Sequence, residues 1–297
     1  MLNHRTDFPA FEAGAGHFLD SAASTLKPRI VIEAMAEFAS TLYANVHRGA
    51  YRLSMESTER YEAARSRVAE FIGASQPEQV ILTRGTTTGL NMIAAGWGGQ
   101  HLHEGDRILL TLMEHHANIV PWQLIARRTG AILDYVSLTT EFRLDLDDLH
   151  RKLESRPKVV AFTGMSNVLG TIPPISDIAN DAREAGALVV VDGAQLVPHR
   201  RVEVDRLGAD FLAFSAHKML GPTGIGVLWG RPQRLEEMEP FEGGGEMISD
   251  VQLDHSTWAA IPHRFEAGTP PIIEAIGLDA AIGYLEKIGM ERVAAHD

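Results

Sequence analysis

Short apolar runs alternate with longer stretches of helical periodicity along most of the chain after residue 78. The runs are rich in Val, Ile and Leu and are continuous rather than alternating, which is typical of strands buried on both faces of a parallel sheet. The pattern therefore predicts an α/β fold with a mostly parallel seven-stranded sheet flanked by helices. The expected strands are 79–83, 107–111, 131–136, 158–163, 187–191, 211–214 and 226–229.

Helical periodicity fills most of the intervals between these runs. Gly130 and Gly186 follow two such stretches, where helix C-caps belong. The last two expected strands lie close together with no helix between them, so we expect one antiparallel pair there. The stretch 240–245 is rich in glycine and is expected to be a loop. The expected helices are 58–71, 118–129, 146–154, 175–185 and 271–288.

Polar motifs follow the expected strands at the points where the strands end. In open parallel sheets, ligands bind beyond the carboxyl ends of the strands, and these ends share one edge. The motifs should therefore lie close together, and the pattern predicts a binding site at that edge. They are at 84–89, 114–118, 166–167, 192 and 215–218.

Lys218 and Asp192 are the most informative pair among these motifs. A buried lysine with a lowered pKa can attack a carbonyl group, whereas a surface lysine is one solvated charge among many. Asp192 ends the run Val189–Val191, and a buried carboxylate is unfavourable unless a cation meets it. It could also cap the following turn through Gly193. Pyridoxal phosphate requires such a pair, because its aldehyde needs an amine and its pyridinium nitrogen needs an anion. Gln195 could bind the phenolic oxygen of the same cofactor.

Two further motifs have both a chemical and an ordinary interpretation. Gly85–Gly89 opens a helix whose free amides and threonine hydroxyls suit a phosphate, although threonine also caps ordinary helices. His217 could bind the same phosphate or be a loop residue. His115 and His116 could bind a metal, but adjacent histidines rarely face one ion and no third ligand lies at helical spacing, so no metal site is expected. One of the two histidines could instead stack on an aromatic cofactor, or both could be ordinary surface histidines.

Composition narrows the class of protein. With 297 residues the chain is long enough for one large or two modest domains, and 45% hydrophobic with 22% charged residues is ordinary for a globular enzyme. A net charge of −12 argues against nucleic acid or anionic membranes as partners. Residues 1–16 lack the apolar core of a signal peptide, so a cytoplasmic location is expected. The absence of cysteine excludes disulfides and thiolate metal sites.

In their order along the chain, the motifs resemble the class V aminotransferase family, and more narrowly the group II cysteine desulfurases, which include selenocysteine lyases. The similarity covers nearly the whole chain, and the set is far more specific than any one motif. The motifs are Leu19–Ser24, Asn45–Gly49, Arg84–Thr87, Met113–Trp122, Ser166–Gly170, Val191–Gln195, Ser215–Gly226, Glu242–Gly245 and Arg264–Pro270.

The resemblance implies a fold type I pyridoxal phosphate enzyme, usually a homodimer. Such an enzyme converts L-cysteine to L-alanine and passes the sulfur to an acceptor protein, as in iron–sulfur cluster assembly. Lys218 resembles the Schiff-base lysine, Asp192 the pyridinium partner and Gln195 the phenolate partner. His115 resembles the histidine that stacks on the ring and takes part in catalysis. The residues that resemble phosphate ligands are Thr87, Ser215 and His217, with Thr86 nearby.

The resemblance also extends to residues outside the strand ends. Asn167 resembles a contact to the substrate carboxylate, and His47 and Arg48 match an active-site loop that would bind substrate. Thr269 matches a residue that reaches the phosphate of the other subunit's cofactor. From chemistry alone, the segments around His47 and Thr269 offer only a basic group and a glycine turn, and a structural loop is the simpler interpretation of both.

Family members usually continue well past the point that corresponds to Asp297. That further portion holds most of a small domain, the cysteine that accepts sulfur as a persulfide, and an arginine that binds the substrate carboxylate. We therefore expect 1–16 to be a segment that would pack on the small domain, 17–270 to be the large cofactor-binding domain, and 271–297 to be a linking helix. We also expect 1–16 to be loosely held. An apolar row should then be partly uncovered unless a dimer buries it, at Ile272, Ile276, Ile282 and Leu285.

Three interpretations of the function stay open, because no residue of this chain can carry a persulfide. The first is a desulfurase whose C-terminal part is lost, cut off or separately encoded. The second is a pyridoxal phosphate-dependent aminotransferase, lyase or epimerase that needs no cysteine. The third is a non-catalytic partner protein that binds the cofactor. A shared fold cannot separate them, because one fold serves many reactions.

Overall fold

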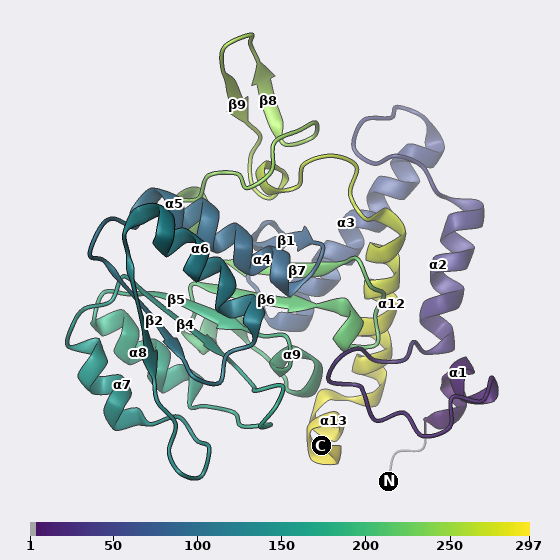
Figure 1. The fold of residues 1–297 in the computed structure, drawn as a ribbon. Helices are drawn as coiled ribbons and strands as arrows, with labels where there is room; N and C mark the ends of the chain where they lie inside the picture. Colours follow the sequence, from purple (N-terminus) through teal and green to yellow (C-terminus); the bar gives the residue numbers. More distant parts are fainter. Residues whose placement is uncertain (1–3) are drawn as a thin grey trace.

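The computed structural model describes residues 4–297 and is built around a seven-stranded sheet (Figure 1). The strands are β1 (Val80–Thr83), β2 (Arg107–Thr111), β3 (Ile132–Val136), β4 (Val159–Thr163), β5 (Leu188–Asp192), β6 (Phe211–Ser215) and β7 (Gly226–Gly230). Their order in the sheet is β1-β7-β6-β5-β4-β2-β3. Strand β7 is antiparallel to both of its neighbours, and the remaining strands are parallel to one another. The predicted sheet and its antiparallel β6–β7 pair are confirmed, whereas the pairing of β1 with β7 was not predicted.

The strands are apolar on both faces because each face carries its own core. In β4, Val160 and Phe162 belong to one hydrophobic cluster, and Val159 and Ala161 belong to the other. Successive side chains of a strand point to opposite faces, so a strand between two cores has no polar face. The helices of the first core include α3 (Arg52–Ile72), α7 (Leu146–Leu153), α8 (Ile175–Glu184) and α12 (Ile272–Ile288), and those of the second include α4 (Thr86–Met92) and α6 (Val120–Thr129).

The expected helices are present, with shifts at their ends. Helix α6 ends at Gly130, whose φ of 80° gives a left-handed cap, as expected. Helix α3 begins six residues before the predicted 58, and α2 (Arg29–Thr41) was not predicted at all. No helix within residues 4–297 combines the length and apolar character needed to cross a membrane. The remaining elements are η1 (Arg5–Asp7), α1 (Pro9–Glu12), η2 (Pro77–Gln79), η3 (Ile93–Trp97), α5 (Gly98–His101), η4 (His116–Asn118), α9 (Leu196–His199), α10 (Val204–Leu207), η5 (Ala216–Lys218), α11 (Pro232–Glu236), the β8 (Ile248–Val251) and β9 (Ser256–Trp258) hairpin that projects at the top of Figure 1, η6 (His263–Phe265) and α13 (Met290–His296).

Helix α12 lies against α2 and α3 (Figure 1). A Cβ atom at Gly277 of α12 would lie 2.6 Å from the sulfur of Met35 in α2, so glycine permits this close approach. Ile282 and Leu285 are 0% and 4% exposed, Ile272 is also buried, and Ile276 is half-buried. The expectation of an uncovered apolar row is therefore wrong for those three buried residues. Helix α2, which the sequence pattern did not reveal, contributes to the cover.

The first described residues lie on the C-terminal half of α12. The Tyr284 hydroxyl donates to Asp7 at 2.6 Å, and the ring of Phe8 meets the Tyr284 ring edge-on at 6.2 Å. The expected looseness of the N-terminal segment and the division at 16 and 270 both stay predictions. Residues 1–3 of that segment lie outside the described residues.

A buried ion pair connects α3 to the segment before α12. The Arg65 guanidinium donates to both oxygens of Glu266, at 2.6 and 2.9 Å, and the two side chains are 1% and 5% exposed. Arg65 also donates to the Val80 carbonyl at 2.9 Å, and Glu266 accepts from the Leu82 amide at 2.7 Å. The pair therefore holds the edge strand β1 between two segments that are far apart in sequence.

We expect Arg65→Ala to lower the free energy of unfolding by about 3–5 kcal/mol, because it leaves the Glu266 carboxylate buried without its cation. Urea denaturation followed by circular dichroism measures the change. Arg52→Ala, which removes the exposed Arg52–Glu56 pair, is the matched control and should change the free energy by less than about 0.5 kcal/mol. Equal effects of the two substitutions would contradict the importance of the buried pair. If Arg65→Ala fails to fold, Glu266→Gln tests the same contact.

Candidate active site

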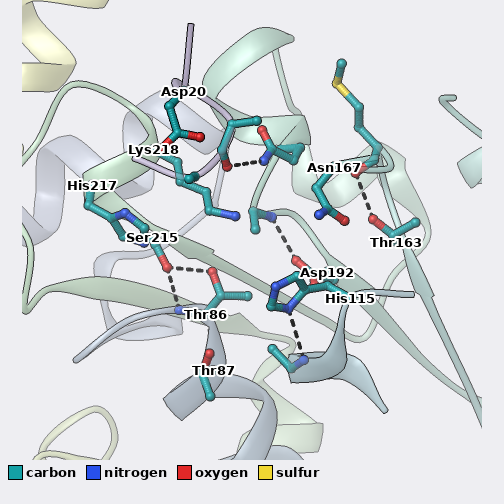
Figure 2. A pocket seen from close by; sticks show the side chains of 16 residues that line it. Asp20, Thr86, Thr87, His115, Thr163, Asn167, Asp192, Ser215, His217 and Lys218 are labelled. Atoms are coloured by element: carbon teal, nitrogen blue, oxygen red, sulfur yellow. Dashed lines mark hydrogen bonds between the residues drawn. The ribbon is translucent and has the colours of Figure 1, made fainter. Parts of the chain in front are cut away.

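A cavity of about 480 Å³ opens at the carboxyl ends of the central parallel strands (Figure 2). The loops after β2, β4, β5 and β6 and the start of α4 form its walls, and residues 20–23 lie over one side. This is the edge at which the sequence placed the site. Of the predicted site residues, the cavity brings together Thr86, Thr87, His115, Asn167, Asp192, Gln195, Ser215, His217 and Lys218.

Asp192 and Lys218 lie on the same cavity, at the ends of adjacent strands. Asp192 is 3% exposed, and within residues 4–297 its carboxylate receives one hydrogen bond, from the Ala194 amide at 2.9 Å. Burial raises the pKa of Asp192, while the Ala194 amide and the charge of Lys218 oppose the rise. Burial lowers the pKa of Lys218, against the opposing effect of Asp192. Figure 2 shows the Lys218 amine pointing into the cavity.

The His115 ring is fixed by the backbone that follows it. As the N-cap of η4, its Nδ1 accepts a hydrogen bond from the Ala117 amide at 3.0 Å. Partial burial lowers the pKa of His115, and the charge of Lys218 lowers it further. A neutral imidazole that accepts at Nδ1 carries its proton on Nε2. His115 lines the cavity, whereas the neighbouring His116 does not.

Glu114 holds the loop of His115 in place through hydrogen bonds, a role that the sequence did not reveal. Its buried carboxyl group binds the Thr111 hydroxyl, the Asn118 side-chain amide at 2.7 Å and the Thr163 backbone amide at 3.0 Å. Burial raises the pKa of Glu114 to about 8, although these hydrogen bonds lower it. The group joins the ends of β2 and β4 to η4 and so holds the segment that carries His115. The sequence signal for this role was an acidic residue in the short loop that follows a buried strand.

One end of the cavity is rich in hydrogen-bond donors suited to an anion. The Ser215 hydroxyl accepts from the Thr86 amide at 2.8 Å and lies 2.7 Å from the Thr86 hydroxyl. Thr87 follows in the first turn of α4, where backbone amides lack partners within the helix. Burial lowers the pKa of His217, and the charge of Lys218 lowers it further, so this imidazole is neutral at pH 7. Hydroxyl and amide donors therefore lie together at this end of the cavity, where the sequence predicted a phosphate-binding site.

A strap formed by residues 22–27 crosses the turn that carries the lysine. The Thr25 amide and hydroxyl both donate to the His217 carbonyl, at 2.9 and 3.0 Å. The Thr25 hydroxyl also accepts from the amide of Leu220, whose φ is 68°. Gln195 donates to the Ala22 carbonyl at 2.7 Å. The strap thus fixes the backbone around Lys218, and nothing local in its sequence pointed to this role.

Three predicted site residues do not line the cavity of their own chain. Thr269 lies at a second, smaller cavity of about 220 Å³ that Arg84 and Glu242 also line. His47 contacts Glu62 at 2.9 Å, and Arg48 pairs with Glu246 at 2.5 Å. Their predicted roles at a cofactor or substrate stay predictions.

The donor set of the cavity fits pyridoxal phosphate. This molecule has an aldehyde, a ring nitrogen, a phenolic oxygen and a phosphate, and the cavity offers an amine, a buried carboxylate, a carboxamide and a group of hydroxyl donors in one place. The buried Asp192 carboxylate is the strongest support for this fit. It receives a single hydrogen bond, from a neutral amide, whereas a buried carboxylate is stable only when a cation faces it.

Known proteins resemble the chain over nearly its whole length. A probable cysteine desulfurase from Halalkalibacterium halodurans is 50% identical over 94% of this chain and 69% of its own length. A cysteine desulfurase from Cronobacter sakazakii is 49% identical over 99% of this chain and 73% of its own length. The apo structure of a cysteine desulfurase from Thermococcus onnurineus NA1 superimposes with a TM-score of 0.92 at 43% identity, covering 97% of this chain and 71% of that one.

The family comparison agrees with these relatives. Residues 17–297, from just before the first expected motif to the last residue of the chain, match the family described as Aminotransferase class-V. The match covers every element that forms the cavity. The chain therefore belongs to the aminotransferase class-V family.

Proposed function

We propose that this chain binds pyridoxal phosphate in the cavity and cleaves the carbon–sulfur bond of L-cysteine, as a cysteine desulfurase does. The observation that carries the proposal is the buried Asp192 carboxylate on the same cavity as the Lys218 amine. Relatives that are about half identical to this chain and are named cysteine desulfurases support the choice of reaction.

The residues that would hold the cofactor divide by its chemical groups. The Lys218 amine would bond the aldehyde carbon, the Asp192 carboxylate would pair with the ring nitrogen, and Gln195 would meet the phenolic oxygen. His115 would lie against the ring. When bound, the cofactor withdraws electrons from the bonds at the substrate α-carbon. The phosphate would be held by Thr86, Thr87, Ser215 and His217.

The cavity residues also control protons. Burial lowers the pKa of Lys218, which favours its neutral amine, and in that form Lys218 can take up a proton from the substrate α-carbon. The His115 Nε2 proton can be donated toward the substrate, because Nδ1 is occupied by the Ala117 amide. Asn167 lines the same cavity and offers amide donors to the substrate carboxylate. Each of these groups is positioned by backbone that the strap or the strand ends hold fixed.

The sulfur acceptor must come from outside these 297 residues, because they contain no cysteine. In the desulfurase reaction, the carbon–sulfur bond breaks, the sulfur passes to an external thiol as a persulfide, and the substrate carbon takes a proton to give L-alanine. The same observation favours one alternative, a β-elimination that releases sulfide and, with one water, yields pyruvate and ammonia. That reaction needs no acceptor thiol.

We also propose that the chain works as a homodimer in the cytoplasm. Thr269 lies at the smaller second cavity and not at the cavity of Lys218, and the family resemblance implies that this residue reaches the phosphate of the other subunit's cofactor. A second subunit would give Thr269 the role that its own chain does not.

We expect Lys218→Ala to abolish the visible absorbance that develops when pyridoxal phosphate is added, because the amine that bonds the aldehyde is gone. Far-ultraviolet circular dichroism should stay unchanged. The matched control is Lys158→Ala, which removes an exposed amine and should leave the spectrum as in the wild type. Full visible absorbance in the Lys218 variant would refute the assignment.

We expect Asp192→Asn to lower turnover of L-cysteine by about a hundredfold or more, because an amide cannot supply the charge that a protonated ring nitrogen needs. Steady-state kinetics at saturating cofactor measures the loss. Asp205→Asn, at an exposed position, serves as control and should behave as the wild type. Unchanged turnover in the Asp192 variant would mean that the carboxylate does not face the ring.

Product analysis separates desulfuration from elimination. With L-cysteine and an external thiol such as dithiothreitol, we expect L-alanine and sulfide in equal amounts, with the rate rising with thiol concentration. Chromatography for alanine and a lactate dehydrogenase assay for pyruvate identify the products. Pyruvate and ammonia at a rate independent of thiol would instead establish the elimination.

A further inference from the structure

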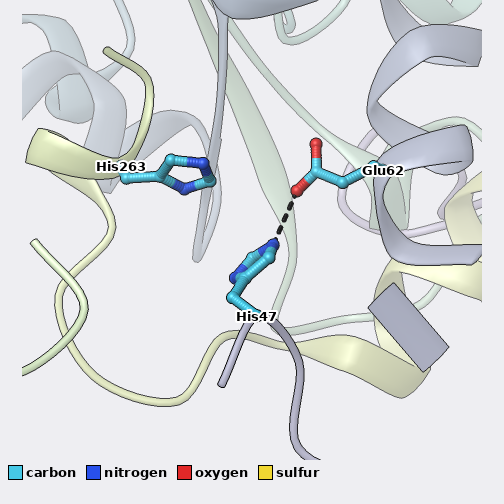
Figure 3. Close-up of side chains that lie close together, drawn as sticks. All are labelled: His47, Glu62 and His263. Carbon is cyan, nitrogen blue, oxygen red and sulfur yellow. Dashed lines mark hydrogen bonds and ion pairs between the residues drawn. The ribbon is translucent and has the colours of Figure 1, made fainter. Parts of the chain in front are cut away.

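Two imidazoles and a carboxylate meet outside the cavity (Figure 3). His47 lies in the loop before α3, Glu62 lies within α3, and His263 begins the turn η6. One ligand atom from each side chain lies within 4.8 Å of the other two. The His47 Nε2 atom is 2.9 Å from a Glu62 oxygen, and the two imidazole centroids are 4.9 Å apart. We call these three side chains the His47 cluster.

The charges around the His47 cluster favour an added cation. Arg65 donates to Glu62 at 2.8 Å, but the same guanidinium also binds both oxygens of Glu266. One guanidinium and two carboxylates leave a net charge of −1 when both imidazoles are neutral. The two Glu62 oxygens lie 2.9 Å from the His47 Nε2 atom and 2.8 Å from the Arg65 Nε atom, so the carboxylate is held between the imidazole and the guanidinium.

The donor types and their exposure suit one class of ion. Two imidazole nitrogens with one carboxylate oxygen form a ligand set that Zn²⁺ and neighbouring divalent transition metals prefer, whereas Mg²⁺ and Ca²⁺ prefer oxygen alone. The side chains of His47 and Glu62 are 21% and 37% exposed, which leaves a path for the ion and room for a water as fourth ligand. Tetrahedral ligands lie about 3.3 Å apart, so the side chains would need to close by only about 1.5 Å.

We propose that His47, Glu62 and His263 form a binding site for a divalent transition-metal ion, with Zn²⁺ as the best match. A bound ion would join the loop of His47 and the turn of His263 to helix α3, and so cross-link positions more than 200 residues apart in sequence. The site lies apart from the cavity of its own chain and does not depend on the reaction proposed above.

The test is Zn²⁺ titration of the tag-free full chain, loaded with pyridoxal phosphate and stripped of metal by a chelator, followed by calorimetry. We expect one Zn²⁺ per chain, and at least about a tenfold weaker affinity in His263→Gln. His255→Gln is the matched control, because His255 is exposed at the β8–β9 hairpin and pairs with its neighbour Asp254. It should bind as the wild type does. Co²⁺ in place of Zn²⁺ should give absorption bands between about 500 and 650 nm that the His263 variant lacks.

Both variants must keep the far-ultraviolet spectrum and the visible cofactor absorbance of the wild type for the comparison to hold. If His263→Gln fails this check, Glu62→Gln tests the same site, because the amide oxygen can still accept from Arg65. Equal Zn²⁺ affinity in the wild type, the cluster variant and the His255 control would overturn the proposal. It would leave the His47 cluster as an ordinary ion pair packed against an imidazole.

Discussion

The buried carboxylate of Asp192 is the constraint on which the rest of the site depends. It ends a strand of valines, is almost fully buried, and receives a single protein hydrogen bond. Burial raises the pKa of this carboxyl group, because an anion in such a place is unstable unless a cation faces it. The cavity therefore suits a ligand that carries a positive charge near Asp192 and has a second group that can bond to the Lys218 amine. Pyridoxal phosphate has both properties.

The sheet topology makes this arrangement possible. Because six strands run in one direction, their following loops all reach the same edge, and the loops after β1, β2, β4, β5 and β6 bring polar side chains to the cavity there. The loops are then fixed by contacts that do not touch the ligand. Glu114 joins the ends of β2 and β4, and Thr25 holds the turn of Lys218 through the His217 carbonyl. The site thus rests on a rigid scaffold rather than on mobile loops.

Desulfuration needs a site that binds the cofactor and activates the substrate, and it needs a thiol that takes the sulfur. The 297 residues contain a cavity suited to the first task, but they contain no thiol for the second. These two tasks have different physical demands. Cofactor binding needs buried charges held within a rigid sheet, whereas an acceptor thiol must be exposed and able to reach a partner. The chain spans about 70% of the length of the relatives that it matches, and the described residues form a cavity whose side chains fit the first task.

The sequence by itself determined the sheet, most of the helices and the residues of the cavity. Short continuous apolar runs that alternate with helical stretches indicate buried parallel strands, and polar residues that follow such strands meet at one edge, so Asp192 and Lys218 could be paired without coordinates. Helix α2 was not predicted, because a helix is recognised poorly where its packing partner is unknown. The burial of Ile282 beneath neighbouring helices was therefore not predicted either. The roles of Glu114 and Thr25 arise from backbone contacts across distant segments. The His47 cluster was also decided by tertiary structure alone, because its three side chains come from separate parts of the chain and no spacing rule connects them.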